Sequence, residues 1–190
     1  MSAVLPLSAS EEGFPASRLE RVFADCFAAR WRTRLVGGAD EPFYQPAVDE
    51  GGVHLLHYRL DYFASALHEA AHWCIAGAAR RQLPDFGYWY APDGRSAEQQ
   101  REFEAVEYRP QALEWFFSRA CGYRFRVSTD NLAAPQGDAL TFRIRVLEQA
   151  TSWRDSGLPQ RASLFFDALA GAFGTGLQAR ALRFELEDLQ

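Results

Sequence analysis

The chain has 190 residues, of which 48% are apolar, enough for a compact core and too many for a disordered or fibrous protein. The formal net charge of −5 and the pI near 5.4 argue against a nucleic-acid partner, because such surfaces need excess basic residues to neutralise phosphates. All 20 basic residues are arginine, which excludes Schiff-base catalysis and the Walker A phosphate loop, since both require a lysine.

The cysteines and the apolar segments indicate the compartment. Cys26, Cys74 and Cys121 are far apart and odd in number, so they predict neither a disulfide framework nor a paired-cysteine zinc site. The N-terminus lacks the basic start and long apolar run of a signal peptide, and the apolar stretch between Glu69 and Arg80 is too short to cross a bilayer. We therefore expect a cytoplasmic protein that contacts no membrane.

The N-terminal part predicts one helix and two strands. From about Ser17, apolar residues recur at helical spacing, which predicts an amphipathic helix. Residues 33–36 predict a short strand closed by the glycine pair at 37–38, and residues 53–59 predict a second strand. The segment between them, 40–52, contains two prolines and two glycines and is expected to be irregular.

The next segment predicts a long helix. Asp61 is a plausible N-cap, and the helix runs to about Gln82. Pro84 marks its end, and residues 85–94 then form an aromatic loop that closes with a turn signal. Small side chains let neighbouring elements approach closely, so we expect this helix to be central; its small residues are Ala64, Ser65, Ala66, Ala70, Ala71, Ala76, Gly77, Ala78 and Ala79.

The C-terminal part is mainly helical in its pattern. Ser96 begins a helix, with Gln99 in the capping-box position, and Pro110 should kink or restart that helix. Residues 125–128 predict a third strand, and residues 138–189 predict two or three further helices.

These elements sum to an α+β fold that is predominantly helical with a small β-sheet. No internal repeat or low-complexity linker divides the chain, so we expect residues 1–190 to form a single domain.

The central helix carries a His-Glu-x-x-His motif, His68-Glu69-Ala70-Ala71-His72. At about 100° per residue, His72 lies only about 40° round the helix from His68 and one turn along, so both imidazoles can bind one ion from the same side. Glu69 is close enough to reach a water bound to that ion without being a ligand. The pattern predicts a metal centre that can activate water, oxygen or a carbonyl.

A third ligand is expected from the helix after the aromatic loop. That helix presents a polar stripe at helical spacing, composed of Glu104, Glu107, Gln111 and Glu114. Such a stripe is often only a solvated face, but Glu107 sits just before the break expected at Pro110, where backbone irregularity often accompanies function. We favour Glu107 as the ligand and Glu104 as its first substitute or as a partner that supports the ligands.

Other candidates are weaker. His54 and His57 are three residues apart, which in a strand sends them to opposite faces and argues against a shared metal. Cys74 is more typical of a buried small apolar residue than of a ligand. The aromatic loop is equally suited to cap the core or to form a lid over a substrate.

Longer segments around these residues resemble a known family. The first group is His68-Glu69-Ala70-Ala71-His72-Trp73-Cys74-Ile75-Ala76-Gly77, Asp85-Phe86-Gly87-Tyr88-Trp89-Tyr90 and Pro92-Asp93-Gly94-Arg95. The second group is Phe103-Glu104-Ala105-Val106-Glu107, Pro110-Gln111-Ala112-Leu113-Glu114-Trp115, Val127-Ser128 and Asp130-Asn131-Leu132. Together they resemble the bacterial elongation factor P hydroxylases, closely over residues 41–132 and loosely in the helical C-terminal part.

The resemblance implies a non-haem, metal-dependent monooxygenase that hydroxylates a lysine of elongation factor P after that lysine has received a β-lysyl group. It implies His68, His72 and one glutamate, for which we favour Glu107, as ligands of Fe(II), with molecular oxygen as co-substrate. Glu69 would manage protons or orient a bound water. The cationic substrate side chain would need an acidic and aromatic channel, for which the candidates are Asp85, Tyr88, Trp89, Tyr90 and Asp93.

Two other functions remain open from the residues alone. A helical His-Glu-x-x-His motif is chiefly the signature of zinc peptidases, with the glutamate as general base, so a zinc metallopeptidase-like hydrolase is the alternative. The extended motif with a third histidine, found in one branch of those enzymes, is absent from the sequence. A third possibility is a non-catalytic module that binds the translation factor and keeps only a structural metal.

Overall fold

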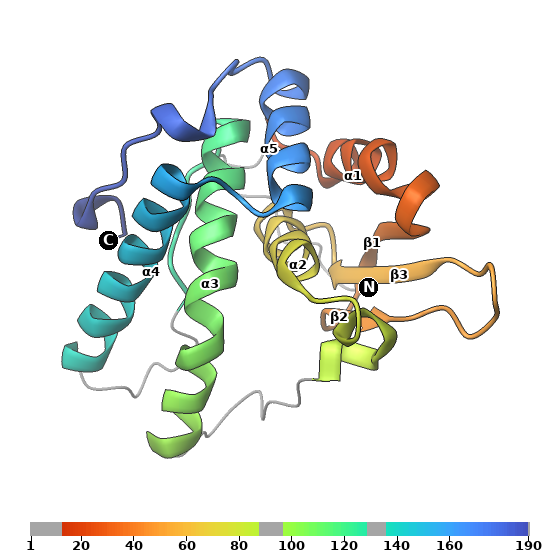
Figure 1. Ribbon diagram of the computed structural model, residues 1–190, viewed down its shortest axis with the longest axis horizontal. Helices are drawn as coiled ribbons and strands as arrows, with labels where there is room; N and C mark the ends of the chain where they lie inside the picture. The colour runs from red at the N-terminus through yellow and green to blue at the C-terminus, as the bar shows by residue number, and fades with distance from the viewer. Residues whose placement is uncertain (1–12, 88–96, 129–135, 190) are drawn as a thin grey trace, which may run out of the picture.

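The computed structural model describes residues 13–87, 97–128 and 136–189, and the side chains of all of these except 97–102 and 136–138. In this part of the chain, five α-helices pack together with a small sheet that lies at one side of the molecule beside α1 and α2, which confirms the predicted α+β class (Figure 1). The helices are α1 (Ala16–Trp31), α2 (Phe63–Ile75), α3 (Ala97–Cys121), α4 (Gln136–Ser156) and α5 (Gln160–Ala172). The strands are β1 (Thr33–Ala39), β2 (Phe43–Gln45) and β3 (His54–Arg59), and the 3₁₀ turns are Arg80–Gln82, Pro84–Gly87, Ala179–Ala181 and Leu186–Leu189.

The sheet has the strand order β1-β3-β2, with β1 parallel and β2 antiparallel to β3. The predictions of β1 and β3 are confirmed, but the prediction that residues 40–52 are irregular throughout is wrong, because β2 lies within them. Its central residue Tyr44 pairs with Leu56, and both side chains are buried. Proline and glycine mark the ends of this short strand rather than its absence.

The glycine pair expected to close β1 instead continues it. The register between β1 and β3 shifts between Val36 and Ala39, so the pair forms a bulge in which Gly38 adopts a φ of +92°. At Gly37, a Cβ would lie 2.6 Å from the hydroxyl of Tyr58, so no larger residue fits without displacing that ring. The bulge keeps β1 paired beyond the glycines, since the Gly38 amide donates to the carbonyl of Leu60.

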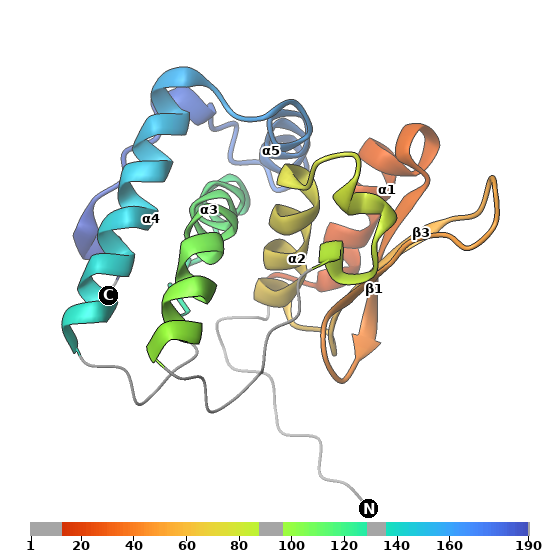
Figure 2. The same cartoon turned by 60° about the horizontal axis from the view of Figure 1, so that its bottom comes forward.

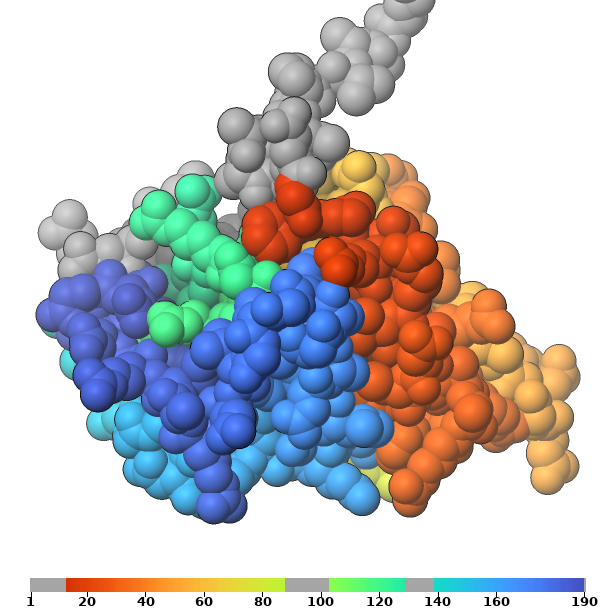
Figure 3. All heavy atoms as spheres, turned by 90° about the horizontal axis from the view of Figure 1, so that it is seen from above, coloured from red at the N-terminus to blue at the C-terminus, as the bar shows by residue number. Residues whose placement is uncertain are grey.

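Helix α2 is the central helix, as predicted from its small residues. It lies between α3 and the sheet in two views (Figures 1 and 2) and contacts α1, α3, α5 and β3. Ala66, Ala70 and Ala71 are fully buried, and their small side chains permit this close packing. From above, α1 and α5 lie side by side (Figure 3), and Trp73 of α2 packs beneath them against Phe27 at a ring distance of 4.6 Å.

The ends of α2 differ from the prediction. The helix begins at Phe63 with Tyr62 as the N-cap and no side-chain capping bond, and it ends at Ile75 rather than near Gln82. Its last carbonyls are taken by an arginine from a distant helix: Nη2 of Arg161 donates to the carbonyls of Trp73, Cys74 and Ala76 at 3.2, 3.0 and 2.6 Å. A guanidinium that satisfies these groups stabilises a helix end, so the chain turns away here despite its helical composition.

Helix α3 passes through Pro110 without restarting. A proline inside a helix costs about 3 kcal/mol or more because it removes a hydrogen bond and crowds the preceding turn. In the next two turns, Trp115, Phe116 and Phe117 are fully buried, and burial of such a side chain contributes roughly 1.5–3 kcal/mol each. The packing of the C-terminal half therefore outweighs the proline, and the predicted break is not required. Ser96, expected to begin this helix, and the side chain of Gln99 lie outside the described residues.

The third predicted strand, residues 125–128, is not a strand. Its backbone pairs with a side chain instead: the amide of Gln111 accepts from the Ser128 N–H at 3.0 Å and donates to the Ser128 carbonyl at 2.7 Å. An amide side chain offers one donor and one acceptor, so it imitates a neighbouring strand at a single position. The prediction of a third strand is therefore wrong, because this segment pairs with one side chain and not with a neighbouring strand.

The C-terminal region confirms the prediction of two or three helices, with α4 and α5 followed by two short 3₁₀ turns. Buried residues from all five helices and from the sheet share one hydrophobic core. The assignment of the whole chain, 1–190, to a single domain stays a prediction. Among the described residues, none of the helices has the length and apolarity needed to span a membrane.

Candidate metal centre

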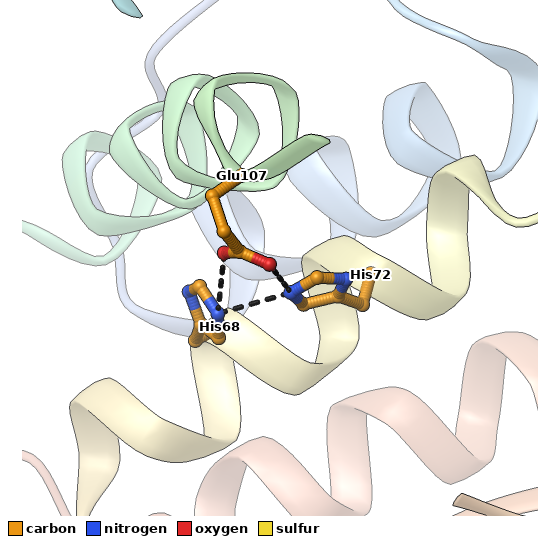
Figure 4. A group of neighbouring side chains, drawn as sticks. All are labelled: His68, His72 and Glu107. Carbon is orange, nitrogen blue, oxygen red and sulfur yellow. Dashed lines mark hydrogen bonds and ion pairs between the residues drawn. The ribbon is translucent and has the colours of Figure 1, made fainter. Parts of the chain in front are cut away.

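His68 and His72 project from the same face of α2 toward α3 (Figure 4). Their ring centroids are 4.7 Å apart, and the two Nε2 atoms are 3.0 Å apart. The one-turn spacing in the sequence therefore produces two imidazole nitrogens that converge on one point. A point reached by both lone pairs is where a metal ion could be bound.

Glu107 reaches the same point from α3. Its carboxylate lies 3.4 Å from Nε2 of His68 and 3.3 Å from Nε2 of His72, and the residue is only 3% exposed. One ligand atom from each of the three residues lies within 4.8 Å of the others, so the group could hold a metal ion. The structure thus brings together the three residues that the sequence favoured as ligands.

Glu114 supports this group from one side. Its Oε2 accepts a hydrogen bond of 2.8 Å from Nδ1 of His68, which fixes the tautomer and orientation of the ring and leaves Nε2 for an ion. The sequence placed Glu114 in the polar stripe of α3 but assigned this supporting position to Glu104. Glu104 is half-buried about one turn before Glu107 and is not a member of the three-residue group.

The charges at the site are coupled. Burial lowers the pKa of His68, but the hydrogen bonds and negative charges of Glu107 and Glu114 outweigh burial and hold that pKa well above its ordinary value. Burial would raise the pKa of Glu107, yet the neighbouring imidazoles hold it far below its usual range. The raised pKa favours the protonated form of His68 in the metal-free protein, although burial also raises the pKa of its hydrogen-bond partner Glu114.

Glu69 lies beside the ligands and outside their group. It is half-buried, and burial raises the pKa of its carboxyl, with the imidazoles of His72 and His68 opposing that shift. It lines a cavity of about 320 Å³ together with His68, Glu107 and Glu114. We call this space the His68 cavity; its other described lining residues are Pro42, Ala64, Ser65, Phe103, Gln111, Arg126 and Ser128.

A second cavity of about 500 Å³ contacts the other imidazole, that of His72. We call it the His72 cavity. Its walls come from the end of α2, from Phe86 and from the Ala105–Pro110 turn of α3, and its described charged residues are Arg80 and Arg109. The three-residue group is thus reached by two spaces of different chemical character.

The start of the aromatic loop holds strained backbone next to His72. Asp85 and Phe86 both have positive φ, 48° and 56°, which costs roughly 1–2 kcal/mol for each non-glycine residue. Contacts with β2 hold this conformation: Asp85 accepts from the Tyr44 amide at 2.7 Å, and Phe86 stacks on the Tyr44 ring at 4.4 Å. The Phe86 ring in turn lies parallel to His72 at 6.5 Å. The other residues expected to line a substrate channel, Tyr88, Trp89, Tyr90 and Asp93, lie outside the described residues.

The weaker candidates have local roles. Nδ1 of His54 accepts a 3.0 Å hydrogen bond from the Ala47 amide, and His57 stacks on Phe43 at 4.1 Å. Cys74 is buried, and burial raises the pKa of its thiol, as expected for an unreactive apolar residue. None of the three belongs to the potential metal group.

The donor set fits a divalent transition metal. Imidazole nitrogen suits zinc and iron alike, and two histidines with one carboxylate leave coordination positions open for water, oxygen or substrate. A divalent cation would also compensate the buried negative charge that Glu107 and Glu114 bring to the site. Fold and site together therefore define a helical α+β protein with a candidate mononuclear metal centre between two helices.

Comparisons with known proteins identify the family. Residues 22–184 match the family described as elongation factor P hydroxylase. The elongation factor P lysine hydroxylase of Haemophilus influenzae is 46% identical over 165 residues, which cover 87% of this chain and 93% of the relative. The chain belongs to the elongation factor P hydroxylase family. The match extends well beyond residues 41–132, where the resemblance was expected to be close.

The structure predicts different effects for two glutamates of α3 on metal affinity. Glu114→Gln replaces a charged acceptor at Nδ1 of His68 by a neutral one, and loss of such support typically weakens metal binding by about 10–100-fold. Glu104→Gln, the control on the same helix, should change the affinity by less than about twofold, because Glu104 is outside the group. Competition with a chromogenic chelator measures both constants. If the Glu104 variant lost more metal affinity than the Glu114 variant, Glu104 would be the ligand or the residue that supports it.

The raised pKa of His68 predicts a pH dependence. A metal ligand must be deprotonated, so the ion has to displace a proton from His68 at any pH below its raised pKa. Affinity should therefore begin to fall at a pH well above the ordinary value of 6.5, and binding at neutral pH should release about one proton from this ring. Calorimetry in buffers of different ionisation enthalpy counts the protons. If metal binding released protons only at a pH near or below 6.5, the two carboxylates would not raise the pKa of His68.

Proposed function

We propose that this chain hydroxylates a lysine side chain of elongation factor P and that it does so as a metal- and oxygen-dependent monooxygenase. Membership of the elongation factor P hydroxylase family supports the reaction and the protein substrate. The observation that supports metal dependence is the convergence of His68, His72 and Glu107 at the contact between α2 and α3. No other arrangement of three such ligand groups occurs among the described residues.

The ion we assign to this site is Fe(II), held by the two Nε2 atoms and the Glu107 carboxylate. When bound, iron supplies the redox chemistry that lets molecular oxygen react with an unactivated carbon. The family resemblance, rather than the ligand set, favours iron, because imidazole and carboxylate suit zinc equally.

Each neighbouring side chain has a separate task in this proposal. Glu114 holds His68 in the orientation that presents Nε2. Glu69, one residue along the helix from His68, orients a water or carries a proton beside the reacting carbon. Glu104 stays the substitute for Glu107, and the comparison of glutamine variants above tests it. Phe86 and the strained backbone before it form part of the wall next to His72.

The substrate form we propose is the lysine that already carries a β-lysyl group, as the family resemblance implies. Elongation factor P is then the protein partner, and the reaction takes place in the cytoplasm, where translation occurs. The net charge of −5 agrees with a partner that presents a cationic side chain rather than a nucleic acid.

The zinc metallopeptidase alternative has no support from the comparisons. The motif alone could not exclude it, because two histidines with an adjacent glutamate on a helix serve both chemistries. The family match extends over most of the chain, and this is far more specific than five residues.

The intact mass of β-lysylated elongation factor P tests the proposal. After incubation in air with the iron-loaded chain and a reductant, we expect a gain of one oxygen atom. His68→Ala should abolish both metal retention and the gain, because it removes one of two imidazole ligands. Glu69→Gln should retain the metal and reduce the rate by about 10²–10⁴-fold, the usual contribution of a positioned acid or base.

Three controls separate the explanations. No gain should occur without oxygen, without iron, or with an unrelated lysine-containing protein. A product cleaved at a peptide bond with a zinc-loaded chain would favour the hydrolase. A folded, iron-loaded chain that adds no oxygen to its substrate would refute the proposal.

A further inference from the structure

The two cavities at the candidate metal centre offer two routes to it, and their charges differ. The described residues of the His68 cavity include three carboxylates, Glu69, Glu107 and Glu114. The described residues of the His72 cavity include no aspartate or glutamate and two arginines, Arg80 and Arg109. Among the described residues, the first space therefore has the charge that favours a cationic side chain and the second does not; an ion bound between them would add its charge to both and leave this difference.

Within the His68 cavity the three carboxylates are not equivalent. Glu107 contacts both imidazoles, and Glu114 is hydrogen-bonded to His68. Glu69 makes no hydrogen bond or ion pair with a described residue, although it is half-buried. A partly buried carboxylate without a partner is unfavourable, and an ammonium group would relieve it.

The opposing charge in this cavity is weaker. Arg126 is the one arginine among the described lining residues of the His68 cavity, and it is exposed, as Arg80 and Arg109 of the His72 cavity are, so solvent screens all three charges. The cavity also adjoins a second hollow of about 350 Å³, since Ala64, Glu114 and Arg126 line both, and the exposed Arg124 is the other described charged residue of that hollow. In that second hollow the rings of Phe14 and Tyr123 meet edge to face at 5.1 Å. Aromatic walls suit the methylene stem of a long cationic side chain.

We propose that the aminoacylated lysine of the substrate reaches the metal centre through the His68 cavity, past Ala64, and that the carboxylate of Glu69 binds its ammonium group. This inference rests on the function proposed above and names the route and the specificity-determining residue. It differs from the expectation drawn from the sequence, which placed the channel at the aromatic loop. Phe86 of that loop lines the His72 cavity instead.

A matched pair of substitutions distinguishes the two routes. Ala64→Phe places a ring where the His68 cavity meets the adjoining hollow, and Ala105→Phe places the same ring in the wall of the His72 cavity. Both residues are on helices and neither is fully buried, so both variants should fold. Circular dichroism and zinc affinity check that fold and metal centre are intact.

The readout is binding of β-lysylated elongation factor P to the zinc-loaded chain, which holds the same ligands and performs no redox chemistry. We expect Ala64→Phe to raise the dissociation constant at least about tenfold, and Ala105→Phe to change it by less than about twofold. Glu69→Gln should weaken binding of the β-lysylated factor by about tenfold and leave binding of its N-acetylated form unchanged, because acetylation removes the ammonium charge.

The opposite ranking of the two phenylalanine variants, or equal effects of both, would overturn the route. If Glu69→Gln weakened binding of the β-lysylated and the N-acetylated factor equally, the Glu69 carboxylate would not bind the ammonium group. Both outcomes are measured as binding to the zinc-loaded chain, so they do not depend on whether the chain hydroxylates its substrate. A chain that binds the cationic side chain past Ala64 but adds no oxygen would refute the proposed function and keep the route.

Discussion

The contact between α2 and α3 is the interaction on which the candidate centre depends. The two histidines are fixed relative to each other by one helix turn, but the carboxylate that completes the group comes from 35 residues further along the chain in a separate helix. The small residues of α2 allow the approach, with Ala70 and Ala71 fully buried within the motif itself. A bulky residue at either position would separate the helices and with them the three ligand atoms.

Other features of the fold hold this contact in place. Arg161 of α5 caps the last carbonyls of α2 just beyond His72, so the helix that carries both imidazoles ends at a fixed point. Trp115, Phe116 and Phe117 anchor the far half of α3 in the core and keep the helix continuous through Pro110. Glu107 therefore lies in a helix whose position is set by packing on its C-terminal side, while its own turn lacks one backbone hydrogen bond.

The buried carboxylates of the site favour a compensating positive charge beside them. Glu107 and Glu114 are both buried, and in the metal-free protein a proton on His68 neutralises part of their charge. A divalent ion can replace that proton and bind the same atoms, which couples metal affinity to pH. The neighbouring strain at Asp85 and Phe86 belongs to the same region, and its position next to His72 is typical of backbone held for function.

The sequence predicted what depends on local periodicity and missed what depends on distant partners. Helical and alternating patterns identified α1, β1 and β3, and the four-residue spacing identified the pair of histidines, because each of these signals lies within one element. The early end of α2 depends on an arginine 88 residues from Trp73, and the backbone at Ser128 pairs with the side chain of Gln111 rather than with a strand. Neither partner leaves a signal in the segment it changes.

The candidate site was likewise predicted only in part from the sequence. Glu107 could be chosen from the polar stripe of α3, but the stripe could not distinguish Glu104 from Glu114 as the supporting carboxylate, because the choice depends on how α3 rotates against α2. The short strand β2 was missed because its pairing with β3 is not local, and the family resemblance carried the substrate, which no pattern of residues revealed.

The most direct test of the account is a crystal structure of the iron-loaded chain, grown without oxygen and measured at the iron absorption edge. One anomalous peak per chain, at roughly 2.0–2.2 Å from Nε2 of His68, Nε2 of His72 and a Glu107 oxygen, is the predicted result. Iron bound elsewhere, or bound to the histidines with Glu104 in place of Glu107, would contradict the claim that the α2–α3 contact forms the centre.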